Sequence, residues 1–340
     1  MLKKMFCVIL ISISSNLLSM QFPTKLPIIY HEGYEIVNSE HIGSTTFYFP
    51  SAKEIYQNLL TFGVNKEKFY KHWMVDTSDI RIVHDDKYME ELVNEDIVNP
   101  YVLKAQKFIT GGTILACNLA MKYGWAINLG GGFNLASSTY SCGSCLLSDV
   151  AIAIHRFWNE NPFTSPQIFI IDLSARQNTS FVEIFQNKSY PSGERFHELN
   201  TNIQIFQMYN LRTFHTYDES LKDLITFNIP LNHEISGEEY FCELNRHLTS
   251  AFETIKRNHA EFSRFYPDLI IYISGTDLSK TMLKITQEDI VKRDSLVFSF
   301  AEQYKIPLVM TLGQSSSQNE GETIFKSILN ILKLKKILPQ

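Results

Sequence analysis

The chain has 340 residues, of which 44% are hydrophobic and 20% are charged, and it carries a formal net charge of −5 with an isoelectric point near 6.1. These values are close to globular averages, and they exclude a collagen, a coiled-coil rod and a protein dominated by a charged tail. Because the chain is slightly negative and has no block of basic residues, we expect no direct contact with nucleic acid. Its partner should be a protein or a small ligand, which the sequence does not identify.

The N-terminus has the pattern of a secretory signal peptide over residues 1–20. Lys3 and Lys4 precede an apolar run at 5–14, and Ser19 is a small residue at a suitable cleavage point. That run is shorter than the roughly 20 residues that span a bilayer, and no later apolar run reaches this length, so the mature chain should have no transmembrane span. The alternative is that this segment forms a buried strand or helix.

Export would place the chain in the secretory pathway or outside the cell. The sequons at Asn178 and Asn187 would then be candidate glycosylation sites. The 5 cysteines are too few for a disulfide scaffold. Cys142 and Cys145 have the spacing of a redox pair but lack thioredoxin-like surroundings, and the sequence leaves open whether they form a disulfide.

Short apolar runs alternate with segments of helical periodicity from residue 26 to residue 338. Near-continuous apolar runs are typical of parallel strands that are covered on both faces. The alternation predicts a single-domain α/β fold with a mostly parallel sheet flanked by helices. The expected strands are 28–30, 126–129, 168–172, 203–208, 269–274 and 308–311, and the expected helices are 52–60, 102–123 with Gly124 as its stop, 239–258 and 290–304.

Polar or glycine-rich segments follow four of the expected strands. In open α/β sheets, ligands bind outside the carboxyl ends of the strands, so we expect the functional residues there. A Walker motif, a dinucleotide-binding G-x-G-x-x-G and the G-x-S-x-G of serine hydrolases are all missing from the sequence. The segments are Gly130-Gly131-Gly132-Phe133, Asp172 with the residues after it, Gly275-Thr276-Asp277 and Leu312-Gly313-Gln314.

In order and spacing, these segments resemble the class IV histone deacetylases, which are zinc-dependent lysine deacylases of the arginase/deacetylase fold. The resemblance extends from about residue 26 to residue 330, and it implies that fold for nearly the whole chain. It also implies that the first 25 residues precede the fold, as a signal peptide would. The motifs that carry it are the glycine triplet with Phe133, Ile171-Asp172-Leu173-Ser174-Ala175-Arg176 and Gly275-Thr276-Asp277, with Thr110-Gly111-Gly112-Thr113 upstream and Ile290-Val291-Lys292-Arg293-Asp294 downstream.

The same resemblance implies that the catalytic positions are substituted. In the family, two histidines follow the Gly-Gly-Gly-Phe motif and act as general base and electrostatic partner; here these positions are Asn134 and Leu135, and neither can shuttle a proton. The transition-state tyrosine of the family corresponds to Ser316, and a channel-wall phenylalanine corresponds to Ser144. A serine hydroxyl reaches less far than a tyrosine hydroxyl, so the oxyanion donor is lost or weakened. With the base, its partner and this donor all substituted, we expect no catalytic residue.

The metal positions of the family are also substituted. Its three zinc ligands correspond to Ser174, Arg176 and Asp277, with Asp172 as a neighbouring carboxylate. A catalytic zinc normally needs three protein ligands, and a guanidinium is a fixed cation that repels it. We therefore expect no zinc and no other cofactor. We predict instead that Arg176 pairs with Asp277, Asp172 or both; the alternative is that Arg176 turns outward.

These substitutions predict a catalytically inactive histone deacetylase-like protein that keeps the fold for binding or for a structural role. Two alternatives stay open. One is residual zinc-dependent lysine deacylase activity of the class IV type that uses other histidines. The second is an intracellular scaffold that competes with active deacetylases, located in the nucleus or cytoplasm as the family is. The available histidines are His31, His84, His155 and His215.

Overall fold

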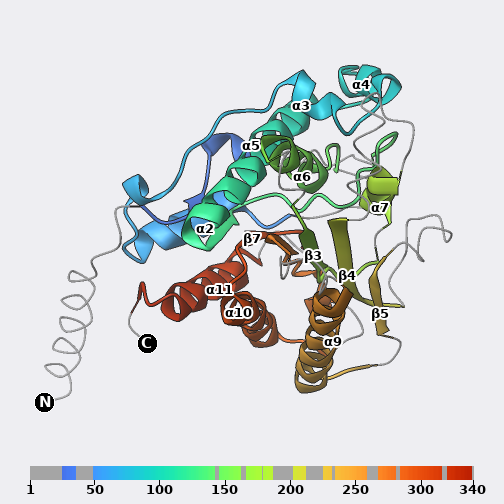
Figure 1. Ribbon diagram of the computed structural model, residues 1–340. Coiled ribbons are helices and arrows are strands. Elements are labelled where there is room, and N and C mark those ends of the chain that lie inside the picture. Colours follow the sequence, from blue (N-terminus) through green and yellow to red (C-terminus); the bar gives the residue numbers. More distant parts are fainter. Residues whose placement is uncertain are drawn as a thin grey trace, which may run out of the picture.

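The computed structural model describes residues 25–35, 49–141, 145–161, 166–177, 179–186, 202–211, 225–231, 234–258, 267–280, 284–315 and 320–338. They form an α/β structure around one seven-stranded sheet in the order β1-β2-β7-β6-β3-β4-β5 (Figure 1). All neighbouring strands in this sheet are parallel. The expected fold class is therefore confirmed.

The strands coincide closely with the apolar runs of the sequence. Every residue of β2, β3, β6 and β7 is buried, as expected for central parallel strands. The fifth strand was not predicted. The bounds are β1 Ile28–Ile29, β2 Trp125–Asn128, β3 Ile168–Asp172, β4 Ile203–Asn210, β5 Phe227–Leu231, β6 Leu269–Ile273 and β7 Leu308–Thr311.

Helices cover both faces of the sheet (Figure 1). The 3-10 helices are η1 Glu32–Tyr34, η2 Lys66–Lys68 and η4 Asp277–Lys280, and none of the described helices is long and apolar enough to cross a membrane. The α-helices are α2 Ala52–Thr61, α3 Thr77–Arg81, α4 Asp86–Leu92, α5 Pro100–Tyr123, α6 Asp149–Glu160, α7 Ser180–Gln186, α9 Gly237–Asn258, α10 Gln287–Tyr304 and α11 Gly321–Leu334.

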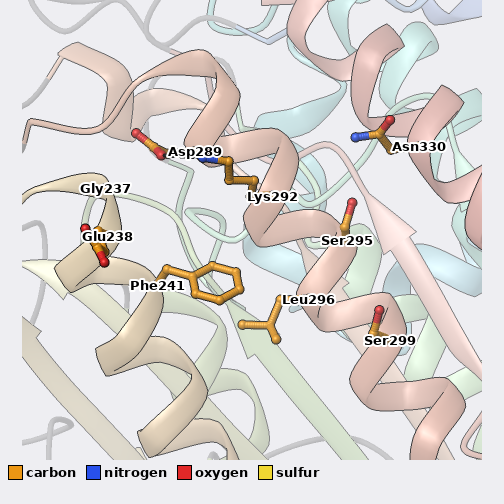
Figure 2. Close-up of a pocket in the computed structure, with 9 residues that line it drawn as sticks. All are labelled: Gly237, Glu238, Phe241, Asp289, Lys292, Ser295, Leu296, Ser299 and Asn330. Atoms are coloured by element: carbon orange, nitrogen blue, oxygen red, sulfur yellow. Dashed lines mark ion pairs between the residues drawn. The ribbon is translucent and has the colours of Figure 1, made fainter.

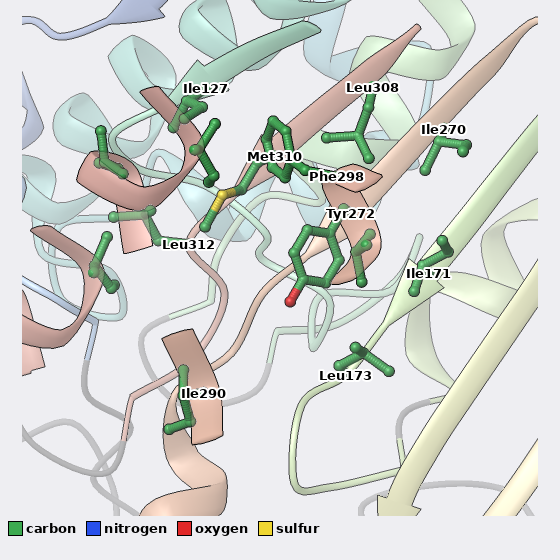
Figure 3. Packing of buried hydrophobic residues seen from close by; sticks show 14 of the residues in the cluster. Ile127, Ile171, Leu173, Ile270, Tyr272, Ile290, Phe298, Leu308, Met310 and Leu312 are labelled. Carbon is green, nitrogen blue, oxygen red and sulfur yellow. The ribbon is translucent and has the colours of Figure 1, made fainter. Parts of the chain in front are cut away.

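Two clusters of buried apolar residues hold these layers together. Successive side chains of a strand point to opposite faces: Ile171 belongs to the cluster that contains residues of α2, α9, α10 and α11, and Ile170 to the cluster that contains most of the buried apolar residues of α5 and α6. Figure 3 shows Tyr272 and Met310 of the first cluster, which lie near Phe298 of α10. The sheet is thus covered on both faces, and its functional loops can only emerge at the strand ends.

Local signals in the sequence fix the helix ends. Pro100 occupies the first turn of α5, where its missing N–H costs no hydrogen bond, and the Asn99 side chain caps this end by accepting from the Tyr101 N–H at 2.9 Å. Gly124 ends the helix with a φ of 79°, as predicted. Helix α10 begins three residues earlier than predicted, because Thr286 and Asp289 form a capping box before the apolar residues begin.

Candidate functional site

The loops after β2, β3, β6 and β7 meet at the carboxyl edge of the sheet. The Gly313 N–H donates to the Gly131 carbonyl at 3.0 Å, and the Thr276 N–H donates to the Gln314 carbonyl at 2.7 Å. The close approach of the loops that contain Gly131 and Gly313 requires a glycine at position 132 as well. Gly132 has a φ of +80°, and a Cβ on it would lie 2.7 Å from the Gly313 nitrogen. The sequence prediction that these loops share one edge is consistent with this arrangement.

Asn134 lies at the centre of a buried polar network. Its Nδ2 donates to Asp172 Oδ2 at 2.7 Å and lies 3.5 Å from Ser174 Oγ, and its Oδ1 accepts from Gln314 Nε2 at 3.0 Å. The other oxygen of Asp172 accepts from the Ser174 N–H at 3.0 Å. All four residues are at most 2% exposed. The amide of Asn134 therefore joins the loops after β2, β3 and β7 through direct contacts between side chains.

Leu135 fills the second substituted position with an apolar side chain. It is 1% exposed and belongs to the same buried cluster as Phe133. An isobutyl group neither donates nor accepts a hydrogen bond, so this position offers nothing to polarise a water molecule or a carbonyl group.

Asp277 stands at the start of η4, after the loop that follows β6. Its Oδ1 accepts from the Ala175 N–H at 2.8 Å, while its Oδ2 is buried and has no hydrogen-bond partner among the described residues. Burial raises the pKa of Asp277 to about 7, and the charges of Arg176 and Arg293 act in the opposite direction. Arg176 is half-buried. Its direct pairing with Asp277 or Asp172 stays a prediction.

These residues do not fit a zinc ion. Ser174 supplies a neutral hydroxyl that already lies beside Asn134, Arg176 supplies a fixed cation, and Asp277 supplies the one carboxylate of the three positions. In the part of the chain that the structure describes, no group of three or more His, Cys, Asp or Glu side chains could hold a metal ion. The misfit to zinc comes from the identity of these side chains, because the strand-end loops that carry them lie at one edge of the sheet.

Arg293 supports the loops after β3 and β6 from beneath. It is 1% exposed, and it donates to the carbonyls of Gly275 at 2.8 Å, Leu173 at 3.4 Å and Ser274. Asp294 balances its charge at 2.8 Å and accepts from the Tyr272 hydroxyl at 2.5 Å. The sequence motif contained both residues, but nothing local in it indicated this supporting role, since Leu173 is 120 residues away.

Three of the four histidines singled out in the sequence are described, and each has its contacts elsewhere. His31 stacks on Phe108 with ring centroids 4.2 Å apart, His84 accepts from the Ser148 N–H at 3.2 Å, and His155 lies 2.9 Å from Asn159. His215 lies outside the described residues.

A second buried network of polar side chains, which the sequence did not predict, lies beside β1 and β2. His72 Nε2 lies 2.7 Å from the Tyr34 hydroxyl, which donates to Asn128 Oδ1 at 2.7 Å. Asn128 Nδ2 donates to Thr113 Oγ1 at 2.9 Å, and Thr113 donates to Asp149 Oδ2 at 2.6 Å. This second network holds the loop that contains Gly130, Gly131 and Gly132, because Asp149 also accepts from the N–H groups of Gly132 at 3.1 Å and Phe133 at 2.7 Å.

Several predicted features fall outside the described residues. The structure leaves untested the signal peptide over residues 1–20, the glycosylation candidates Asn178 and Asn187, and the substituted positions Ser316 and Ser144. The disulfide question is also untested, since Cys145 is buried and Cys142 lies in the same undescribed stretch as Ser144.

A surface groove of about 600 Å³ lies between α9 and α10 (Figure 2). Phe241 and Leu296 face one another across it, and Asp289 and Lys292 lie at one end. Asn134, Leu135, Ser174, Arg176 and Asp277, the described positions of the site, do not line this groove.

Comparison with known proteins identifies the family. The histone deacetylase domain matches residues 50–314, and the chain belongs to the histone deacetylase family. It is 28% identical over 337 residues to Histone deacetylase 2 of Arabidopsis thaliana, covering 91% of this chain and 79% of that protein. It is 25% identical over 326 residues to an uncharacterized protein of Picosynechococcus sp., covering 89% of this chain and 96% of that one.

A solved structure supports the fold independently of sequence. The crystal structure of the HDA15 HD domain superposes with a TM-score of 0.65 at 13% identity, covering 90% of this chain and 87% of the other. At this level of identity the likeness concerns the fold alone.

Proposed function

We propose that this chain is a catalytically inactive member of the histone deacetylase family, of the class IV type, which keeps the fold for binding or for a structural role. The observation that carries the proposal is the amide of Asn134, which is held between Asp172 at 2.7 Å and Gln314 at 3.0 Å. A general base must exchange a proton near neutral pH, and a carboxamide has no such proton to exchange.

The surrounding residues support the same proposal. Leu135 offers no polar atom, and the three metal positions include a neutral hydroxyl and a fixed cation. Removing a single group from a catalytic unit can cost several orders of magnitude in rate, and here the base, its partner and two metal ligands are all replaced. We therefore expect no partial mechanism that a single remaining carboxylate could carry.

Activity and metal content together test this proposal. The purified full-length protein is incubated with acetyl-lysine and longer acyl-lysine peptides in the presence of added zinc, and its metal content is measured by mass spectrometry. We expect no release of acetate or fatty acid above a heat-denatured control and no stoichiometric zinc. Chelator-sensitive hydrolysis together with one zinc ion per chain would overturn the proposal.

Residual deacylase activity is a second candidate, and one observation favours it. Asp277 Oδ2 is buried without a hydrogen-bond partner among the described residues, as a retained metal ligand would be before a metal binds. One carboxylate is insufficient for a catalytic zinc, which needs two more ligands. The Asp277→Asn variant separates the two cases: it would abolish any genuine zinc-dependent hydrolysis but should change nothing measurable in an inactive protein.

We propose further that the chain is exported after cleavage within residues 1–20 and glycosylated at Asn178 and Asn187. The support is the sequence pattern of a short basic region, an apolar run and a small residue. The intracellular scaffold is the alternative. N-terminal sequencing of the protein from its native source, together with its electrophoretic mobility before and after glycosidase treatment, distinguishes them, because the scaffold would keep Met1 or Leu2 and show no shift.

A further inference from the structure

The amino edge of the sheet, opposite the strand-end network, carries a concentration of lysines. The chain as a whole has a net charge of −5, so a basic surface on it is unexpected. Glu67 and Glu302 lie among these lysines, and Glu302 pairs with Lys335 at 3.6 Å. We call these residues the amino-edge lysines: Lys25, Lys66, Lys68, Lys122, Lys305, Lys333, Lys335 and Lys336.

Direct contacts join the lysines that lie near the start of β1. Lys25 Nζ lies 4.8 Å from the ring centroid of Tyr70, whose hydroxyl is 2.7 Å from that of Tyr123. Lys122 Nζ lies 5.1 Å from the Tyr123 ring centroid. The Leu26 N–H donates to the Lys68 carbonyl at 2.9 Å, so this backbone segment lies along the same strand start.

The remaining amino-edge lysines belong to the ends of α10 and α11, next to the same surface. The Leu308 N–H donates to the Gly124 carbonyl at 3.2 Å, which brings the start of β7 beside the end of α5. Lys305 lies just before β7, and Lys335 is joined to α10 through Glu302. Figure 1 shows the C-terminal end of α11 on the same side of the molecule as the blue segment that contains η2.

The dipoles of the helices explain only part of this charge. A lysine at a helix C-terminus stabilises the exposed carbonyls, which accounts for Lys122, Lys305 and Lys333. Lys25 lies outside any helix, and its Nζ lies 3.5 Å from the Phe69 carbonyl as well as over the Tyr70 ring. Lysines that gather on one surface create a positive potential that attracts an anionic partner, whatever each contributes locally.

We infer that the amino edge docks on an anionic membrane surface. Apolar side chains stand among the lysines: Met121 is 47% exposed and Tyr123 is 40% exposed. Tyrosine is favoured at membrane interfaces, where apolar side chains beside basic ones enter the headgroup region. The inference is independent of the proposed function.

The test is binding of the full chain to lipid vesicles. Vesicles of phosphatidylcholine with phosphatidylserine are compared with phosphatidylcholine alone, at low and at high salt. We expect binding to the anionic vesicles that weakens as salt screens the charges. The variant Lys122→Glu, Lys305→Glu, Lys333→Glu should bind at least about tenfold more weakly, since each lysine near an anionic surface contributes roughly 1 kcal/mol.

A matched variant carries the same change in net charge on other surfaces. Lys87, Lys104 and Lys292 are exposed, and two of them lie on α5 and α10 toward the opposite ends of those helices. The triple change of these residues to Glu should leave vesicle binding within about twofold, because each residue lies beyond a Debye length of about 8 Å from the surface. Equal loss in both variants, equal binding to neutral vesicles, or binding to heparin without binding to vesicles would each overturn the inference.

Discussion

At the scale of single residues, Asn134 is the centre of the strand-end network. Its amide donates to Asp172 and accepts from Gln314. Because both neighbours are buried, they depend on this amide for their hydrogen bonds. The residue on which the proposed function rests therefore also joins the loops after β2, β3 and β7.

This dependence predicts a measurable loss of stability in Asn134→Ala. The variant removes the hydrogen bonds that Asn134 makes to buried Asp172 and Gln314, so the free energy of unfolding should fall by about 1–3 kcal/mol. Urea denaturation measures the change. Asn118 is the matched control: its amide bonds Glu160 on the surface at 3.2 Å, and Asn118→Ala should cost less than about 0.5 kcal/mol. Equal losses in the two variants would contradict the role of the network.

His72 predicts how stability responds to acid. Burial lowers its pKa to about 4, while the hydrogen bond to the Trp73 carbonyl opposes this shift. A base with a depressed pKa in the folded state binds its proton more readily when unfolded, so its contribution to stability is complete above about pH 6.5 and is lost as the pH falls toward 4. His84, with a pKa lowered to about 4 by burial, acts in the same direction.

The variant His72→Gln removes this titration while keeping groups that can bond Tyr34. Its free energy of unfolding should therefore fall less between pH 7 and pH 4.5 than that of the unmodified chain, as measured by urea denaturation at both pH values. His247→Gln is the control: His247 is half-buried, and burial lowers its pKa less strongly than that of His72, so its removal should change the pH dependence in the same direction but by less. An unchanged pH dependence in His72→Gln would show that His72 is not the group that titrates.

At the scale of elements, the loop after β2 depends on glycines that the strand arrangement requires. Gly131 has a φ of +80°, and a Cβ on it would lie 2.4 Å from Asp149 Oδ2. Gly124 has almost the same φ, +79°, but nothing lies within 4 Å of an added Cβ. The two glycines therefore separate the cost of backbone strain from the cost of crowding.

We predict that Gly131→Ala destabilises the chain by about 2–4 kcal/mol, the sum of left-handed strain and overpacking. Gly124→Ala should cost only the strain, about 1 kcal/mol. Chemical denaturation of both variants gives the difference. If the two losses were equal, the close approach of the loop to Asp149 would contribute nothing to stability.

The elements also show what the sequence could predict. Strands β2, β3, β6 and β7 are continuous apolar runs, and they were predicted almost to the residue. Strand β5 was missed because it lies at the sheet edge, is only partly buried and contains Pro230, which the edge position tolerates. Helix α6 was not predicted, although its sequence has a marked amphipathic periodicity.

The same reasoning divides the site into predictable and unpredictable parts. That the loops carrying Asn134, Asp172 and Gln314 share one edge follows from a parallel sheet, in which every carboxyl end lies on the same side. The hydrogen bond between Asn134 and Gln314 joins residues 180 positions apart, so no local pattern could reveal it. The role of Asp149 was missed for the same reason, since it is set by packing between α6 and the glycine loop.

At the scale of the whole molecule, apolar side chains are packed against both faces of one sheet. A ligand that binds only the folded state raises stability, by about 2.7 kcal/mol when its concentration is one hundred times its dissociation constant. An active zinc protein of this fold should therefore lose stability to a chelator. The substituted metal positions predict that this chain does not.

The final prediction concerns zinc and the melting temperature. Neither chelator nor added zinc should shift the thermal unfolding of the unmodified chain, because Ser174 and Arg176 cannot bind the ion beside Asp277. The double variant Ser174→Asp, Arg176→His restores a carboxylate and an imidazole at these positions. It should unfold at a lower temperature without metal, because it places new carboxylate charge near buried Asp172, and it should regain stability when zinc is added. Differential scanning calorimetry follows both chains, with magnesium as the control ion. If zinc raised the melting temperature of the unmodified chain, the metal site would survive in a form that these side chains do not suggest. If zinc left the melting temperature of the double variant unchanged, the loops would no longer hold the ligand geometry.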